Sequence, residues 1–167
     1  PVIDSPDVGE RMIEHLSFAM PYRLNKDVGS HRNFFGLGAV KAMARYLLTR
    51  KGVMATGPFE VGAFCNAAHP DGRTDLPLYL GGYTFAVGDD NNPVPLDKIG
   101  PRPGITIYGQ LLRLTSEGSL RVTGPTAAHA PDIQPNWLST DHDRASAIAA
   151  MKLMRRFMQQ QPLKPLV

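Results

Sequence analysis

The 167-residue sequence has one cysteine, Cys65, which excludes an internal disulfide framework and a cysteine-based zinc site. It also lacks long hydrophobic runs, since no stretch approaches the roughly 18 apolar residues that a membrane span needs. The formal net charge is only +3, and Lys and Arg form no dense cluster, which argues against a nucleic-acid partner. What remains is an ordinary globular composition, with 43% hydrophobic and 20% charged residues, sufficient for one domain with its own core.

The sequence also lacks the marks of a targeting segment. It opens on PVIDSPDVGE, without an initiator Met and without the apolar core of a signal peptide. We therefore expect a cytoplasmic protein, and a chain that is a fragment or a processed product of something longer.

Alternating apolar and polar residues predict several strands. Residues 15–24 have a strand-like apolar and aromatic bias. Further strands are expected at Phe59–Cys65, Leu76–Val87, Ile105–Thr115 and Leu120–Thr123. The last two are predicted to form a hairpin, in which Gly118 allows the positive φ that such a loop requires.

Two segments are predicted to be helical. Residues 33–52 repeat apolar positions at helical spacing and end at Gly52, and Asp141–Gln160 begins at a capping Asp141. The second helix is expected to cover the sheet with a stripe of Ala145, Ile148, Ala149, Leu153 and Phe157. The predicted fold class is α+β, an antiparallel sheet covered by helices on one face.

No motif in the chain is a self-sufficient catalytic or metal centre. His69 in HPDGR lies in a polar connection, where a turn is the simpler interpretation, and no acidic residues are spaced to complete a metal site with it. His15 lies where a loop meets an apolar strand, and both a structural and a functional role stay open. Glu60 is an isolated carboxylate at the start of an apolar strand, for which both interpretations also stay open. Phe35–Val40, FGLGAV, lacks the spacing of a dinucleotide-binding loop.

Five segments, in one order, resemble the glucose–methanol–choline family of flavin-dependent alcohol oxidoreductases. They include the DVGERMIEHLSF segment, with Arg11 where the family has Asn and Glu14 in place of Asp. The others are TGPFEVGAF, TDLPLYLGG, LLRLTSEGSLRVTG and APDIQPNWLSTDHD. The resemblance spans Val8 to Asp143, which is most of the chain.

The resemblance implies that residues 1–167 form a single substrate-binding domain, part of an FAD-dependent alcohol dehydrogenase or oxidase. The glycine-rich FAD-binding segments are absent from this sequence, and the family's catalytic base, a His, is expected beyond Val167. The chain alone is therefore expected to bind no FAD, to be inactive, and to self-associate through the surface that should meet its missing FAD-binding domain.

The resemblance also implies substrate-binding residues for a small alcohol. His15 matches a family histidine near the substrate. Ser17 stands where choline-oxidising relatives carry Glu, and Tyr79 stands where the family has a pocket His. Glu60 completes the predicted substrate-binding set. No catalytic, cofactor-binding or metal-binding residue is predicted within the chain.

Two other functional classes stay open at this stage. One is a binding module without catalysis, and the other is a flavin-containing hydroxynitrile lyase of the same fold. A glycine-rich loop upstream and the catalytic His segment downstream would exclude the first, and flavin reduction by an alcohol would exclude the second.

Overall fold

The computed structural model describes residue 3 and residues 5–68, 72–86 and 98–167. The strands are β1 (Leu16–Arg23), β2 (Val61–Cys65), β3 (Leu76–Gly81), β4 (Gly104–Leu111), β5 (Ser119–Arg121) and β6 (Asp132–Gln134). The α-helices are α1 (Gly36–Thr49) and α2 (Asp141–Met158), and the short 3-10 helices are η1 (His31–Phe34), η2 (Val53–Ala55) and η3 (Lys164–Leu166). The predicted α+β class is confirmed.

Four strands form one antiparallel sheet in the order β1-β4-β3-β2. β1 pairs with β4 over its whole length, from Leu16 opposite Leu111 to Arg23 opposite Gly104. β3 lies between β4 and β2. Because residues directly opposite one another point to the same side of a sheet, these registers assign every strand side chain to one of two faces.

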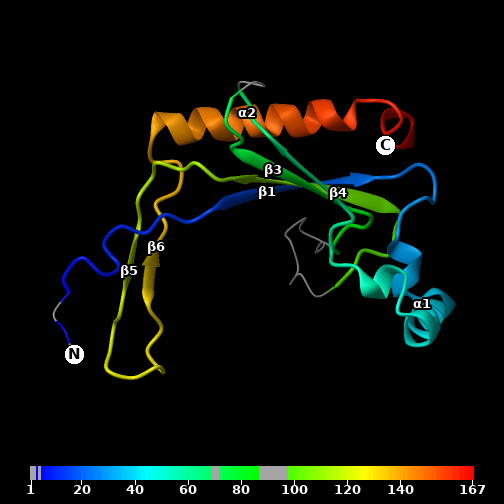
Figure 1. Cartoon of the computed structure of the whole chain (residues 1–167), viewed down its shortest axis with the longest axis horizontal. Helices are drawn as coiled ribbons and strands as arrows, with labels where there is room; N and C mark the ends of the chain where they lie inside the picture. Colours follow the sequence, from blue (N-terminus) through cyan, green and yellow to red (C-terminus); the bar gives the residue numbers. More distant parts are fainter. Residues whose placement is uncertain (1–2, 4, 69–71, 87–97) are drawn as a thin grey trace.

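Helix α2 lies along one face of the sheet (Figure 1). Its residues Ala147, Ala150, Met154 and Met158 recur at helical spacing and are buried. Gly109 of β4 allows α2 to come close, since a Cβ at this position would lie 2.7 Å from the sulfur of Met154. The sheet residues of this core are Leu76, Leu78, Ile105, Ile107 and Leu111.

The opposite face, called here the open face, has no helix of the described chain over it (Figure 1). Along β1, Ser17, Ala19, Pro21 and Arg23 are exposed while their neighbours are partly buried. Phe64 of β2 is on this face and is 66% exposed. In the part of the chain that the structure describes, the sheet is therefore covered by a helix along only one side, and its open side carries both polar and apolar side chains.

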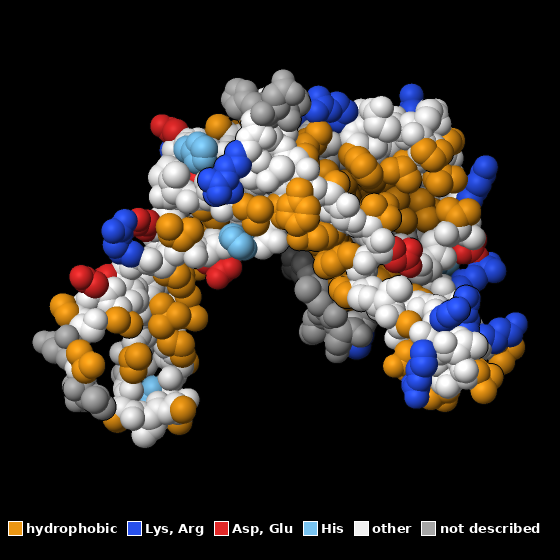
Figure 2. All heavy atoms as spheres, in the orientation of Figure 1, with side chains coloured by type: hydrophobic (Ala, Val, Ile, Leu, Met, Phe, Trp, Pro, Cys, Tyr) orange, Lys and Arg blue, Asp and Glu red, His pale blue; other side chains and the backbone are white. Residues whose placement is uncertain are grey.

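Two segments extend from the sheet on its open side, so the molecule has the shape of an arch (Figures 1 and 2). One is the antiparallel ribbon of β5 and β6. The other contains η1, α1 and η2, which pack against one another. Neither α1 nor α2 combines the length and apolar character that crossing a lipid bilayer requires.

Asp143, in the first turn of α2, joins this helix to the segment that follows β4. Its side chain is fully buried, and one oxygen accepts hydrogen bonds from the backbone and the hydroxyl of Thr115, at 2.9 and 3.0 Å. The other oxygen accepts from the backbone of Ser116 at 2.8 Å and from its hydroxyl. Burial alone would raise the pKa of Asp143, but these hydrogen bonds outweigh burial and lower it to about 2.

The predicted hairpin of Ile105–Thr115 with Leu120–Thr123 is wrong. β4 ends at Leu111, and β5 pairs with β6 instead of returning along β4. The physical reason is the Asp143 carboxylate, which takes the backbone N–H groups of Thr115 and Ser116 that a hairpin would have paired with another strand. The chain consequently turns away from the sheet into the ribbon.

Other predicted boundaries also differ. β2 begins at Val61 rather than Phe59, and β3 ends at Gly81, well before the predicted end at Val87, which lies outside the described residues. Gly82 follows β3, and its carbonyl accepts a hydrogen bond from the backbone of Ser30 instead of a strand partner. A loop contact therefore ends this strand where apolar alternation alone would continue it.

Both helices differ in detail from the prediction. In α2, Ile148 of the predicted stripe is 55% exposed, because the small residues Ala147 and Ala150 make the close contact with the sheet. Thr140, and not Asp141, caps α2, since its hydroxyl accepts from the backbone of Asp143 at 3.3 Å. Helix α1 ends before Arg50, which has a left-handed φ of 55°, rather than at Gly52.

Replacing Asp143 with Asn should destabilise the fold by about 3 kcal/mol, because an uncharged amide leaves buried donors of Thr115 and Ser116 poorly satisfied. Urea unfolding followed by circular dichroism measures this change. The matched control is Asp141→Asn, in the same helical turn, whose side chain is 99% exposed and pairs only with Arg144. Equal stability of the two variants would contradict the structural role of Asp143.

The same carboxylate should make stability depend on pH in the acid range. An unfolded aspartate titrates near pH 3.9, whereas Asp143 in the fold titrates at about 2. Its contribution, about 3 kcal/mol, is therefore complete above about pH 5 and is lost progressively as the pH falls through 2. Unfolding free energies of the wild type minus those of Asp143→Asn should shrink over this interval, and a constant difference would contradict the assignment.

Candidate functional site

The open face brings together polar and aromatic side chains from the three strands β1, β4 and β3. In the β1–β4 register, Ser17 lies opposite Gln110 and Ala19 lies opposite Tyr108. In the β3–β4 register, Tyr108 lies opposite Tyr79. Two neighbouring rows of side chains therefore lie on this face, one formed by Ser17 and Gln110 and the other by Ala19, Tyr108 and Tyr79.

His15 stands next to the row of Ser17 and Gln110, immediately before β1. The side-chain amide of Gln110 donates to Nδ1 of His15 over 2.9 Å. Its other ring nitrogen, Nε2, has no hydrogen-bond partner in the part of the chain that the structure describes. A neutral His15 that accepts at Nδ1 carries its proton on Nε2, so this nitrogen is a donor available to a ligand.

An aromatic group occupies the middle of the open face. The ring of Phe59 stacks on Tyr79 at 5.1 Å between centroids and meets Tyr108 edge-on at 5.0 Å. Burial raises the pKa of Tyr108, so its phenol stays protonated and can donate a hydrogen bond at neutral pH. This part of the face can hold an apolar body and bind a hydroxyl group at its edge.

The structure places three of the four predicted site residues on this face. Ser17 lies in the first row, Tyr79 lies in the second, and His15 precedes Ser17 at the edge of the open face. Glu60 precedes β2 and lines a hollow together with Phe59 and Tyr79. Its backbone N–H donates to the carbonyl of Leu80, and its carboxylate accepts from the hydroxyl of Ser30 at 3.1 Å. The structure thus brings His15 and Ser17 together beside β1, and Glu60 and Tyr79 together beside β2.

Sequence reasoning missed three residues of the face, Phe59, Tyr108 and Gln110. Tyr108 and Gln110 are two positions apart in a segment that was correctly predicted as a strand, so period-2 alternation alone assigns them to one face. That face could not be identified as the one carrying His15 and Tyr79 without the register between strands distant in sequence. Phe59 precedes β2 and follows no such alternation.

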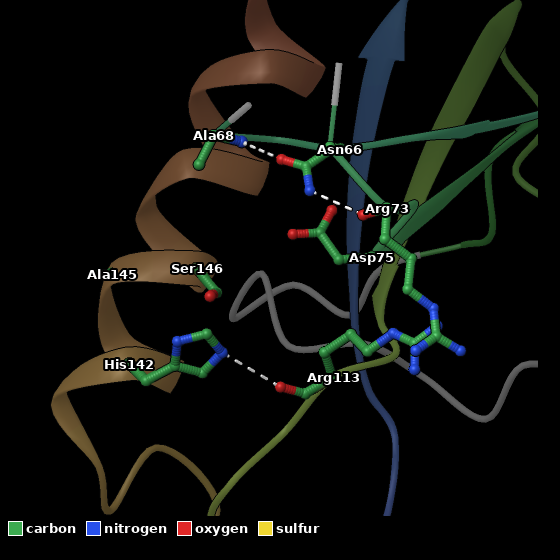
Figure 3. A pocket seen from close by; sticks show the side chains of 9 residues that line it. Asn66, Ala68, Arg73, Asp75, Arg113, His142, Ala145 and Ser146 are labelled. Atoms are coloured by element: carbon green, nitrogen blue, oxygen red, sulfur yellow. Dashed lines mark hydrogen bonds between the residues drawn. The ribbon is translucent and has the colours of Figure 1, made fainter. Parts of the chain in front are cut away.

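A second hollow, of about 560 Å³, lies beside α2 between the β2–β3 connection and the first turns of the helix (Figure 3). Among its lining residues, the amide of Asn66 donates to the carbonyl of Arg73 at 2.8 Å. Nε2 of His142 lies 3.2 Å from the carbonyl of Arg113. These contacts tie the connection and the segment after β4 to their neighbours, on the side of the sheet that α2 covers. The hollow is therefore separate from the open face.

The described residues offer neither a metal site nor a phosphate-binding loop. No group of three or more His, Cys, Asp or Glu among them is arranged to hold a metal ion. The glycines at the start of α1 follow η1 instead of a strand, and a Cβ at Gly38 would collide with the carbonyl oxygen of Arg32. Gly38 therefore serves helix packing. His69 and its neighbours 70–71 lie outside the described residues.

Three curated relatives cover nearly all of this chain. It is 24% identical to dehydrogenase pyvF of Aspergillus violaceofuscus, over 95% of this chain and 26% of the relative. It is 25% identical to an oxygen-dependent choline dehydrogenase of Staphylococcus xylosus, over 99% and 28%, and 27% identical to dehydrogenase str4 of Strobilurus tenacellus, over 97% and 29%. The chain thus spans between a quarter and a third of the length of these relatives.

A solved structure and a family model agree with these relatives. The fold matches the crystal structure of pyridoxine 4-oxidase from Mesorbium loti with a TM-score of 0.69 and 20% identity, over 99% of this chain and 27% of that one. The model of the GMC oxidoreductase family matches residues 115–166, which include Asp143 and all of α2. The family model, the relatives and the fold all agree with the resemblance seen in the sequence, so this chain is similar to the carboxyl-terminal part of the GMC oxidoreductases, the glucose–methanol–choline family.

Proposed function

We propose that this chain forms the substrate-binding wall of an FAD-dependent alcohol oxidoreductase. The observation that carries the proposal is the asymmetry of the sheet, which is sealed by α2 on one face. The other face presents His15, Ser17, Tyr79 and Tyr108 in two neighbouring rows. Relatives named as dehydrogenases and an oxidase support a redox function for the whole enzyme.

FAD would be held by other segments of that enzyme. GMC oxidoreductases carry FAD, which accepts hydride from the substrate carbon when it is bound. Binding a dinucleotide requires a strand, a glycine-rich loop and a helix whose N–H groups hold the pyrophosphate. The described residues contain no such unit, so the role proposed for this chain is to bind and orient the alcohol. The histidine that accepts the hydroxyl proton is predicted in a segment after Val167.

The chemistry of the open face favours a neutral alcohol. The described strands place no Asp or Glu on it, and the carboxylate of Glu60, which lines a hollow with Phe59 and Tyr79, already accepts a hydrogen bond from Ser30. A quaternary ammonium such as choline needs a carboxylate or an aromatic cage. Here Phe59, Tyr79 and Tyr108 pack on one another, and the donors of His15 and Tyr108 suit a hydroxyl oxygen.

Replacing Ser17 with Glu in the full-length protein should raise kcat/KM for choline, because a carboxylate on the open face attracts the ammonium. Steady-state kinetics with choline and a panel of neutral aliphatic and aromatic alcohols measure the change. The wild type should prefer at least one neutral alcohol over choline. The matched control is Ser17→Gln, which has similar size without charge and should leave choline turnover low. Higher kcat/KM for choline than for every neutral alcohol in the wild type would contradict the substrate assignment.

The 167-residue chain by itself should not retain FAD, because the described residues offer no cradle for its pyrophosphate. Titration of the purified chain with FAD, followed by flavin fluorescence, should show no saturable quenching. The full-length protein provides the comparison and should purify with flavin bound. Stoichiometric flavin in the isolated chain would show that residues of this segment hold the cofactor and would overturn the division of roles proposed here.

A further inference from the structure

Helix α1 has an outward apolar face that no described residue covers. Leu37, Val40, Met43, Leu47 and Leu48 recur along one side of the helix and are 78%, 63%, 44%, 60% and 84% exposed. The opposite side carries Ala42, which is buried where α1 packs against the two neighbouring 3-10 helices. An exposed row of large apolar side chains on an ordered helix marks an interaction surface.

The charges around this row are all of one sign. Between Val28 and Phe59 the sequence has five Lys or Arg residues and no Asp or Glu. Lys41 and Arg45 lie on α1 beside the apolar row, and Arg50 and Lys51 follow its end. The described residues provide no salt bridge for these four, although the guanidinium of Arg50 lies 5.1 Å from the ring centre of Tyr46. Figure 2 shows blue cationic groups beside orange apolar groups on this projection.

This combination discriminates between possible occupants of the surface. A second copy of the chain would bring the same cations against each other, and a protein interior would bury them without a partner charge. The surface of an anionic bilayer suits both the apolar row and the cations beside it, because its acyl region accepts the leucines while its head groups neutralise Lys and Arg. Helix α1, with 14 residues, is about 21 Å long, which suits lying in the plane of the interface.

We propose that α1 docks this chain on an anionic lipid bilayer, with its leucines in the interface and its cations on the head groups. The position of α1 supports the proposal, since α1 lies in a projection well away from α2 and the ribbon (Figure 1). A bilayer can reach it there without displacing any described element. The inference does not depend on which alcohol the open face binds.

The test is co-sedimentation of the full-length protein with vesicles of phosphatidylcholine alone or of phosphatidylcholine mixed with phosphatidylserine. Binding should occur to the mixed vesicles and weaken with added salt. Leu47→Glu with Leu48→Glu should reduce binding at least tenfold. The matched control is Val8→Glu with Ile148→Glu, which changes two side chains that are 78% and 55% exposed on other elements and should bind as the wild type does.

A milder variant guards against misfolding of the leucine variant. Lys41→Gln with Arg45→Gln leaves the apolar row intact and should weaken binding to the mixed vesicles about fivefold for each charge removed. The proposal is overturned if the wild type binds neither vesicle, or if the leucine variant and its matched control bind equally. It is also overturned if the leucine variant abolishes self-association in gel filtration while the wild type ignores vesicles, which would assign the face to a second copy.

Discussion

The carboxylate of Asp143 lies where the sheet, the ribbon and helix α2 meet, and its four hydrogen bonds define how these parts are joined. It anchors the first turn of α2 to the segment leaving β4. That anchor sets where α2 begins along the sheet, and thus which of its residues meet Gly109. It also directs the ribbon toward the open side of the sheet. A single buried charge is retained here because hydrogen bonds to both oxygens stabilise its ionised form.

The covered face of the sheet is built for close packing, whereas the open face is suited to binding. The covered face is closed by small residues on α2 and a glycine on β4, which permit close contact and leave no room for a ligand. The open face instead displays side chains with hydrogen-bonding capacity on paired strands, and the Gln110–His15 bond and the ring contacts of Phe59 add to that support. Binding groups on strands are positioned more rigidly than groups on loops, so this surface suits the orientation of a small substrate.

The sequence alone was sufficient for the class of fold and for the existence of most elements. Period-2 alternation predicted β1, β2, β3 and β4, and helical spacing predicted α1 and α2. Period-2 alternation gave a wrong prediction between residues 111 and 124, where the local pattern resembles a hairpin. A carboxylate almost thirty residues farther along the chain claims the backbone donors there. No local pattern reports such a contact.

For the candidate site, the resemblance to known flavoenzymes selected His15, Ser17 and Tyr79, and their roles stay predictions. That they share a face follows only from the registers of β1 and β3 on β4, which bring together residues far apart in the chain. Glu60 was chosen for being an acid near an apolar strand. It lines a hollow with Tyr79, and its carboxylate accepts a hydrogen bond from Ser30, so its role also stays a prediction.

The order of strands in the sheet also has a consequence for synthesis on the ribosome. β1 is made before β4, and β4, the strand that pairs with it along its whole length, follows about eighty residues later. At typical elongation rates of about 5–20 residues per second, β1 waits several seconds or longer for its partner. During that interval Leu16, Phe18 and Met20 cannot be buried in their final contacts. The nascent chain is thus a natural client for chaperones that shield apolar segments until the central strand emerges.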